Sequence, residues 1–220
     1  MPRPSCMPRK LQSELLDSLP HEHPDALHNR RDLRLTNQIM GNHRWLARTL
    51  RRLVQTRDTL LEIGAGTGEL GGRLAERDLA VDGLDLWPRP ADWPAARRWH
   101  VADLRAFDGY AHYNVIFGNL IFHQFSDADL AAFGARIRGT TRLFVACETT
   151  RRRISQVLYR MPGPLFGASH VSLHDGHVSI AAGFQGEELP TALQFPVRDW
   201  QIECRTTALG AYHLIAERQS

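Results

Sequence analysis

The stretch from Thr59 to Leu70, which reads TLLEIGAGTGEL, constrains this chain more than any other. An apolar run that carries one acid, Glu62, leads into three glycines spaced G-x-G-x-G and then into a segment compatible with a helix. This order predicts a strand, a glycine turn and a helix. Glycines remove Cβ atoms where a ligand must lie against the backbone. Helix N-terminal amides together with a carboxylate suit a ligand that carries amino, carboxylate and ribose hydroxyl groups.

Two other sites that use glycine turns fit this stretch less well. A P-loop requires G-x-x-x-x-G-K-[ST], and Lys10 is the only lysine in the chain. A dinucleotide fold prefers G-x-G-x-x-G, whereas the third glycine here comes one position early. The stretch therefore does not predict a pyrophosphate ligand.

Composition describes an ordinary globular chain. Its 220 residues, 43% hydrophobic and 23% charged, are enough for one domain with a short appendage. No apolar run approaches the ~20 residues of a membrane span and the first residues are not a secretory signal, so we expect a cytoplasmic protein. The cysteines, Cys6, Cys147 and Cys204, form neither a disulfide framework nor a C-x-x-C metal site. A net charge of +3 permits contact with nucleic acid but does not by itself indicate it.

The order of elements predicts an open α/β sheet. Strand-like runs alternate with helix-like segments from residue 57 to Cys147, as expected of a doubly wound parallel sheet. Ser126 and Asp129 give one of these helices a start that resembles a capping box. Two strand-like runs near the C-terminus, 200–205 and 211–217, are close enough to pair as an antiparallel hairpin.

Three further segments complete the predicted organisation. Residues 1–31 predict a loose arm, because they contain several prolines and little apolar periodicity. Residues 32–56 predict a helical cover of two helices joined at Gly41. The main domain, 57–220, includes an insert at about 150–190 that is rich in Gly, Pro and His.

A carboxylate ends the second predicted strand. Asp85 follows the sequence GL and lies where, in nucleotide-binding α/β folds, an acid accepts hydrogen bonds from ribose hydroxyls. An ordinary surface aspartate is the alternative, but the preceding glycine turn favours the ribose role.

Together these features resemble the class I S-adenosylmethionine-dependent methyltransferases. The stretch that contains Glu62 resembles their motif I, which typically reads (V/L)-L-(D/E)-x-G-x-G-x-G. The resemblance covers the chain from about Asp58 onward and, more loosely, the helices before it. It implies a doubly wound seven-stranded sheet, mostly parallel with an antiparallel C-terminal hairpin strand, and an N-terminal helical cover over cofactor and substrate.

The resemblance implies S-adenosyl-L-methionine as the cofactor. Asp103 ends the third predicted strand, where the family has an acid that accepts from the adenine amino group. The fourth strand ends in GNLIFHQF, which resembles motif IV of small-molecule methyltransferases and differs from the Asn-Pro-Pro-Tyr pattern of many amide and adenine-amine methyltransferases. The residues expected to contact the cofactor are Glu62, Gly64, Ala65, Gly66, Gly68, Asp85, Leu86, Asp103, Leu104, Asn119 and Leu120.

Two histidines are candidates for a catalytic role. His123 follows the fourth strand, where an imidazole can take a proton from a substrate hydroxyl. The alternative is a buried histidine that is hydrogen-bonded under the cofactor. His174 lies in HDGHVSI, which resembles the region after the fifth strand in methyltransferases that modify phenolic or polyketide-derived products. An ordinary loop is the alternative there, and the spacing of its neighbours His170 and His177 matches none of the common zinc sites, so no metal is expected.

The sequence therefore predicts an S-adenosylmethionine-dependent methyltransferase with a small-molecule acceptor. The specific hypothesis is O-methylation of a hydroxylated aromatic or polyketide-like metabolite. An RNA or protein methyltransferase that uses the arginines of 44–52 and 151–153, and a non-catalytic module that binds the cofactor, are alternatives. A nicotinamide oxidoreductase fits least, and the sequence does not indicate an oligomeric state.

Overall fold

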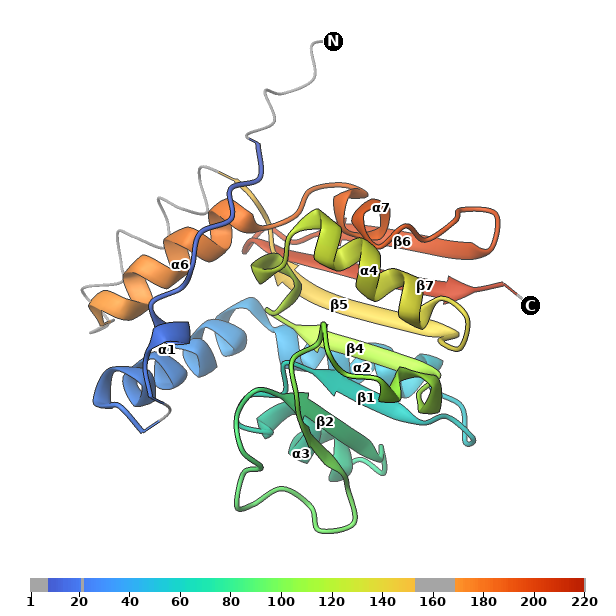
Figure 1. Cartoon of the computed structure of the whole chain (residues 1–220), viewed down its shortest axis with the longest axis horizontal. Helices are drawn as coiled ribbons and strands as arrows, with labels where there is room; N and C mark the ends of the chain where they lie inside the picture. Colours follow the sequence, from blue (N-terminus) through green and yellow to red (C-terminus); the bar gives the residue numbers. More distant parts are fainter. Residues whose placement is uncertain (1–7, 21, 153–168, 220) are drawn as a thin grey trace.

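A seven-stranded sheet forms the centre of the molecule, with the strand order β3-β2-β1-β4-β5-β7-β6 (Figure 1). The structure is a computed structural model that describes residues 8–20, 22–152 and 169–219. Strands β1 to β5 pair in parallel, and β6 runs in the same direction, whereas β7 lies antiparallel between β5 and β6. The predicted fold class is thereby confirmed. The strands are β1 (Leu60–Ile63), β2 (Val81–Asp85), β3 (Trp99–Val101), β4 (Val115–Asn119), β5 (Leu143–Thr149), β6 (Trp200–Thr206) and β7 (Ala211–Arg218).

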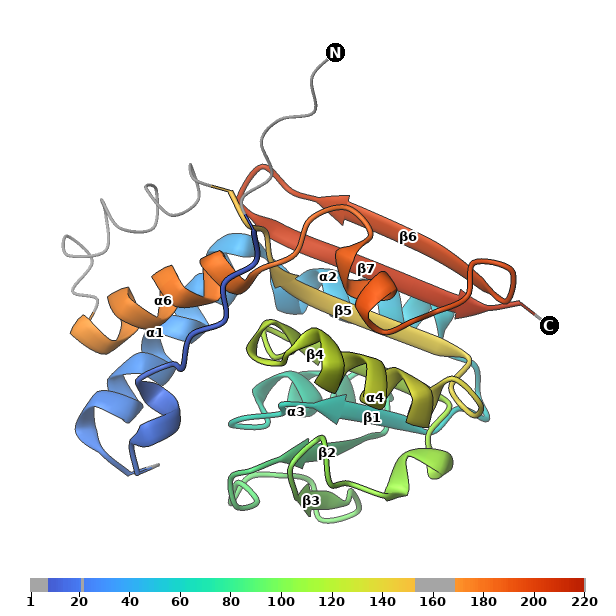
Figure 2. The same cartoon turned by 45° about the horizontal axis from the view of Figure 1, so that its top comes forward.

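Helices cover both faces of the sheet. In Figures 1 and 2, α4 and α7 lie on one face and α2 and α3 lie on the other. α1 and α6 lie side by side beyond one end of the sheet. None of the described helices is long and apolar enough to span a membrane. The helices are α1 (Pro24–Met40), α2 (Asn42–Leu53), α3 (Glu69–Ala75), α4 (Asp127–Ile137), α6 (His170–Ala182) and α7 (Glu188–Ala192), with short 3₁₀ turns η1 (Leu16–Ser18), η2 (Gly109–His112) and η3 (Phe122–Gln124).

The central strands are apolar throughout because both of their faces are buried. Successive side chains of a strand point to opposite faces. Leu61 and Ile116 therefore pack in the core that α4 and α7 share, whereas Leu60 and Val115 pack in the core of α2 and α3. These two cores hold the carboxyl ends of β1, β2 and β4 in fixed positions.

The predicted start of α4 is confirmed. The Ser126 hydroxyl accepts a hydrogen bond from the Asp129 amide at 3.1 Å, and the Asp129 side chain accepts one from the Ser126 amide at 3.2 Å. This capping box satisfies two donors at the helix terminus.

The helical cover begins earlier than expected. The break at Gly41 is as predicted, with φ at 72°, a left-handed conformation that glycine adopts readily. α1 starts at Pro24, however, inside the segment expected to be loose. Proline at the first helical position and a His23 ring nitrogen that accepts from the Asp25 amide at 3.2 Å start the helix there.

The expected insert contains a helix. Residues 153–168, including Arg153 of the basic run, lie outside the described residues, but α6 occupies 170–182 where Gly, Pro and His suggested irregular structure. Val171, Asp175 and Val178 are buried at helical spacing, and Ser169 caps the helix through the Ser172 amide. α6 packs against α1 and forms one wall of a cavity at the carboxyl ends of the strands.

Candidate active site

A cavity of about 560 Å³ opens at the carboxyl ends of β1, β2 and β4. α1 and α6 wall it from the other side, together with residues of the N-terminal segment. This is the place where an open α/β sheet changes strand order and usually binds its ligand. The expected residues that line it are Glu62, Gly64, Ala65, Gly66, Asp85, Leu86, Leu104, Asn119, Leu120 and His123.

The three glycines of the turn are required for different structural reasons. All have positive φ, at 65° for Gly64, 56° for Gly66 and 73° for Gly68. A Cβ at Gly64 would lie 2.6 Å from the Ile121 side chain, and one at Gly68 would lie 2.7 Å from Trp93, so both permit close packing. A Cβ at Gly66 would meet only a carbonyl oxygen at 4.0 Å and would project into open space. Gly66 thus keeps the backbone accessible to a ligand, while Gly68 does not line the cavity.

Asp85 is held by the glycine turn. Its Oδ2 accepts from the Gly66 amide at 2.7 Å, and its Oδ1 accepts from the Trp87 amide at 2.9 Å. Burial raises the pKa of Asp85, although these backbone hydrogen bonds oppose the shift. Each carboxylate oxygen retains a lone pair that can accept from a ligand hydroxyl.

Glu62 lies beneath the turn and is 3% exposed. Burial, together with the nearby charge of Asp85, raises the pKa of Glu62 to about 8. Its Oε2 is buried and has no hydrogen-bond partner among the described residues. A buried polar atom without a partner is uncommon and indicates a place where a ligand donor or water belongs.

Asn119, at the end of β4, has another buried side-chain oxygen that the described residues leave without a hydrogen-bond partner. Its Nδ2 donates to Asn37 Oδ1 at 3.0 Å, and Asn42 Nδ2 donates to the same oxygen at 3.0 Å. The Oδ1 of Asn119 is buried and has no hydrogen-bond partner in the part of the chain that the structure describes. The following residue, Leu120, has φ at 57°, an unusual value for a side chain with a Cβ. Asn37 comes from α1, and no local pattern in the sequence pointed to it.

His123 lies between two carboxylates. Its Nδ1 is 2.6 Å from Glu148 Oε2, and its Nε2 is 3.2 Å from Glu14 Oε1. Burial alone would lower the pKa of His123, but the charge of Glu148 and the hydrogen bonds to both carboxylates outweigh burial and raise the pKa to about 10. The imidazole therefore holds both protons near neutral pH. Because both of its ring nitrogens already carry a proton, His123 is a poor acceptor for a substrate proton.

The N-terminal strap, which we define as residues 8–20, crosses the cavity from the start of α4 to α6. Arg9 forms an ion pair with Asp127 at 2.7 Å and donates to the carbonyls of Phe125 at 2.7 Å and Ala182 at 2.8 Å. Farther along, the amides of Leu15 and Leu16 donate to Asp175 at 2.7 and 3.1 Å.

Glu14 of the N-terminal strap reaches the cavity. Its carboxylate accepts from His123, from Gln124 at 3.1 Å and from the Ser179 hydroxyl. Burial opposes the charge of Glu14, but these partners outweigh burial and lower its pKa. Residues 8–20, expected to be part of a loose arm, are thus anchored along the cavity.

Besides Gly68, two more of the expected site residues, Asp103 and His174, lie outside the cavity. The Asp103 carboxylate is bound by Arg105, with Nη2 and Oδ2 2.6 Å apart, while the flanking Ala102 and Leu104 line the cavity. His174 points outward with 40% of its side chain exposed and lies 3.0 Å from Asp175. No group of three or more His, Cys, Asp or Glu residues in the described part of the chain is arranged to hold a metal.

The strand order, the glycine turn and the acid at the end of β2 define the class I S-adenosylmethionine-dependent methyltransferase fold. Solved structures of this fold are similar to the chain over most of its length. The plantazolicin methyltransferase BpumL, in complex with a triazolic desmethylPZN analogue and SAH, matches with a TM-score of 0.70 and 12% identity over 93% of both chains. Magnesium protoporphyrin IX methyltransferase (ChlM) from Synechocystis PCC 6803, with bound SAM, matches with a TM-score of 0.56 and 14% identity over 87% of this chain and 84% of its own.

A third similar structure is described by the words "Conversion of a Disulfide Bond into a Thioacetal Group during Echinomycin Biosynthesis". It matches with a TM-score of 0.56 and 17% identity over 79% of this chain and 82% of its own. Neither a protein-family model nor a curated protein matches the sequence. At these identities the similarity establishes the fold, so the predicted resemblance is confirmed at that level. Function must be argued from the cavity.

Proposed function

We propose that this chain is an S-adenosylmethionine-dependent methyltransferase that acts on a small-molecule acceptor. The observation that carries the proposal is the set of free acceptor atoms around the glycine turn. Asp85 can accept from ribose hydroxyls, and the unpaired Glu62 Oε2 and Asn119 Oδ1 can accept from an amino group. Structures of the same fold contain SAM or SAH.

The residues present fit this cofactor. Gly66 leaves room for it against the backbone. Glu62 would bind its amino group as a carboxylate, because a cationic amino group beside it favours release of the proton that burial otherwise retains. When bound, the cofactor supplies an electrophilic methyl group on a sulfonium. Further contacts proposed from the sequence are those of Gly64, Ala65, Leu86, Leu104 and Leu120, which line the cavity. Contacts of Gly68 and Asp103, which do not line it, stay predictions from the sequence alone.

The acceptor would bind beneath the N-terminal strap. Glu14, Gln124 and Ser179 line this part of the cavity from the strap, η3 and α6. Enclosure by these segments excludes water and fixes the acceptor relative to the methyl group, the main contributions that a methyltransferase makes to rate.

The finer proposal is O-methylation of a hydroxylated aromatic or polyketide-like metabolite. A hydroxyl group can donate a hydrogen bond to the Glu14 carboxylate, which lines the cavity. We assign His123 the role of a positioning residue that orients Glu14, in place of a free base. His174 is retained only as a residue that could affect acceptor binding through its neighbour Asp175.

Calorimetric titration with SAM and SAH tests the proposal. Asp85→Ala should weaken both about ten- to a hundred-fold, because it removes charged acceptors of the ribose hydroxyls. Asp92→Ala, a change to an exposed acid in the loop after β2, should have no effect. Failure of the wild-type chain to bind either compound would overturn the proposal.

Transfer of labelled methyl groups to fractionated small molecules then tests the acceptor class. The expected product carries the label on an oxygen, which mass spectrometry and NMR identify. Transfer to RNA with steep salt dependence would instead support the polyanion alternative. Binding without transfer to any acceptor would support a non-catalytic module.

A further inference from the structure

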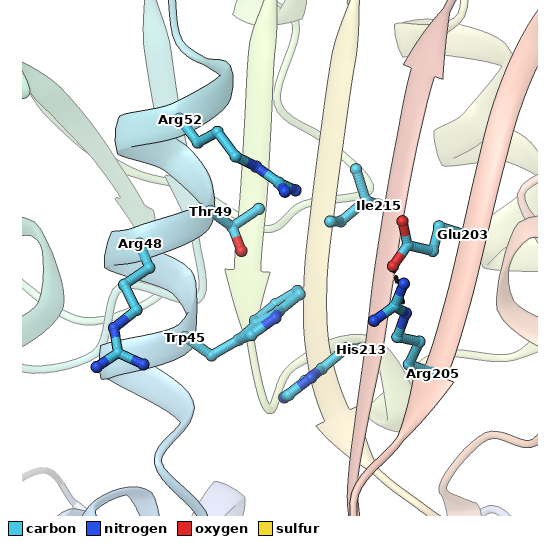
Figure 3. Close-up of a pocket in the computed structure, with 8 residues that line it drawn as sticks. All are labelled: Trp45, Arg48, Thr49, Arg52, Glu203, Arg205, His213 and Ile215. Atoms are coloured by element: carbon cyan, nitrogen blue, oxygen red, sulfur yellow. Dashed lines mark ion pairs between the residues drawn. The ribbon is translucent and has the colours of Figure 1, made fainter.

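A second pocket lies on the face of the sheet that α2 covers, between α2 and the β6–β7 hairpin (Figure 3). Its volume is about 300 Å³, at the lower end of the range for small-molecule sites. It shares no lining residue with the cavity at the strand ends. The lining residues are Trp45, Arg48, Thr49 and Arg52 of α2, Glu203 and Arg205 of β6, and His213 and Ile215 of β7.

The floor of this pocket contains a buried polar atom without a partner. The Trp45 ring stacks on His213 with 3.8 Å between ring centroids and 7° between planes. His213 is 8% exposed, and its Nε2 has no hydrogen bond to any described residue. Burial lowers the pKa of His213 to about 4, so the ring is neutral near pH 7. In one of its two tautomers it offers a buried N–H donor.

The walls carry an excess of positive charge. Three arginines line the pocket against one carboxylate, Glu203, which pairs with Arg205 at 2.5 Å. Arg48 and Arg52 have no ion-pair partner among the described residues. Figure 3 shows Arg52 reaching from α2 toward the strands, whereas Arg48 turns along the helix. Solvated arginines alone would be unremarkable on a surface, but here they line the same pocket as a buried histidine nitrogen that has no hydrogen-bond partner among the described residues.

We propose that this pocket binds the phosphate group of a small dianionic ligand, with His213 Nε2–H as its buried donor and Arg52 and Arg48 as its charge partners, Arg48 after its exposed side chain has swung from the helix toward the strands. Guanidinium groups match phosphate oxygens in geometry and remain charged at all physiological pH values. Two uncompensated arginines match the charge of a dianion better than that of a monocarboxylate. A neutral imidazole can donate one hydrogen bond without the cost of a buried charge. The site is independent of the proposed methyl transfer.

Titration with inorganic phosphate and with phenyl phosphate at pH 8, at constant ionic strength, tests the proposal. Both probes should bind with saturation, and acetate should bind at least ten-fold more weakly. Arg52→Gln should weaken phosphate binding about ten-fold or more, because a charged hydrogen-bond donor is lost. The matched control is Arg44→Gln, on the same helix and exposed but absent from the pocket lining, which should leave affinity unchanged.

The imidazole nitrogen signals of His213, followed by NMR during the same titration, report the buried donor directly. They should shift with the same midpoint as the calorimetric binding curve. Absence of saturable phosphate binding would overturn the proposal, as would equal weakening by Arg44→Gln and Arg52→Gln. Unmoved His213 signals during saturable binding would also overturn it, because the phosphate would then occupy another site.

Discussion

Gly66 and Gly186 both adopt left-handed backbone, at φ 56° and 50°, but only Gly66 borders the cavity. A Cβ at Gly186 would meet nothing within 4 Å. Gly66→Ala and Gly186→Ala should therefore each lose about 1–2 kcal/mol of folding free energy from the same backbone strain. Only Gly66→Ala should also lose affinity for SAH, because its methyl group projects into the ligand space. Denaturant unfolding and calorimetry on both variants measure the two effects, and equal SAH affinity in the two variants would contradict the role of Gly66.

The protonation of His123 can be tested without an acceptor. Imidazole nitrogen shifts should remain those of an imidazolium from pH 6 to pH 9, because the pKa of His123 is raised to about 10 by its carboxylate partners against the effect of burial. Glu14→Gln should lower this pKa, since it removes one of the two charges. Glu76→Gln, which changes an exposed acid of the same type, should not. Titration of the wild-type His123 near pH 6.5 would restore the hypothesis of a free base.

Local pattern predicted some of these residues and not others. Glycine turns and polar residues at strand ends are recognisable from neighbouring residues in the sequence, so local pattern predicts Gly66, Asp85 and Asn119. It does not predict Glu14, because the contact of Glu14 with His123 joins residues 109 positions apart. Asn37 meets Asn119 across 82 positions. Such pairs depend on how α1 and the strap close over the sheet, which no short window of sequence specifies.

The N-terminal strap depends on one arginine for much of its attachment. Arg9→Met would remove the ion pair with Asp127 and the hydrogen bonds to the carbonyls of Phe125 and Ala182. The amides of Leu15 and Leu16 should then exchange with deuterium on the order of ten-fold faster, because local opening costs less free energy. Lys10→Met is the control, since that side chain is exposed and, among the described residues, Lys10 is bonded only through its backbone amide, which donates to the Ala181 carbonyl.

The strap should also affect catalysis if it encloses the acceptor. Arg9→Met should keep SAH affinity and lose turnover, as expected for a segment that closes over a site without holding the cofactor. Exchange at Leu15 and Leu16 that is equal in Arg9→Met, Lys10→Met and wild type would show that the strap is held by other contacts.

α6 was harder to predict than the central strands for a physical reason. A strand buried on both faces is a continuous apolar run, so β4 and β5 stand out in the sequence. α6 instead buries Ser172 and Asp175 beside its apolar residues, because the N-terminal strap supplies donors for Asp175. A helix stabilised by polar contacts with a distant segment has no clear hydrophobic stripe. Its histidines and Gly176 therefore resembled a loop.

For the molecule as a whole, the sequence predicts the fold but not the raised pKa values of two buried side chains, Glu62 and His123. The alternation of strands and helices and the final hairpin suffice for the seven-stranded sheet. The pKa values of Glu62 and His123 depend on the burial that this sheet creates. Both residues keep a proton in the folded chain at pH values where the unfolded chain has released it.

This difference predicts that folding stability falls as pH rises from 6.5 to 8. The unfolded chain loses the Glu62 proton near pH 4.3 and the His123 proton near pH 6.5. The folded chain keeps them up to about pH 8 and about pH 10. The folded state binds more protons across this window, so unfolding free energy decreases with pH by up to about 2.7 kcal/mol per pH unit for the two groups together. Below pH 6.5, His213 acts in the opposite direction, because burial lowers its folded pKa to about 4.

Urea unfolding at pH 6.5 and pH 8 measures this slope. Glu62→Gln replaces the carboxyl group with a neutral amide of similar shape and should roughly halve the loss of stability between the two pH values. Glu76→Gln, at an exposed position, should leave the loss unchanged. A wild-type stability that is constant or rises from pH 6.5 to pH 8 would show that Glu62 and His123 are not both protonated in the folded chain. The Glu62→Gln variant then separates the two, because any slope that it retains belongs to His123.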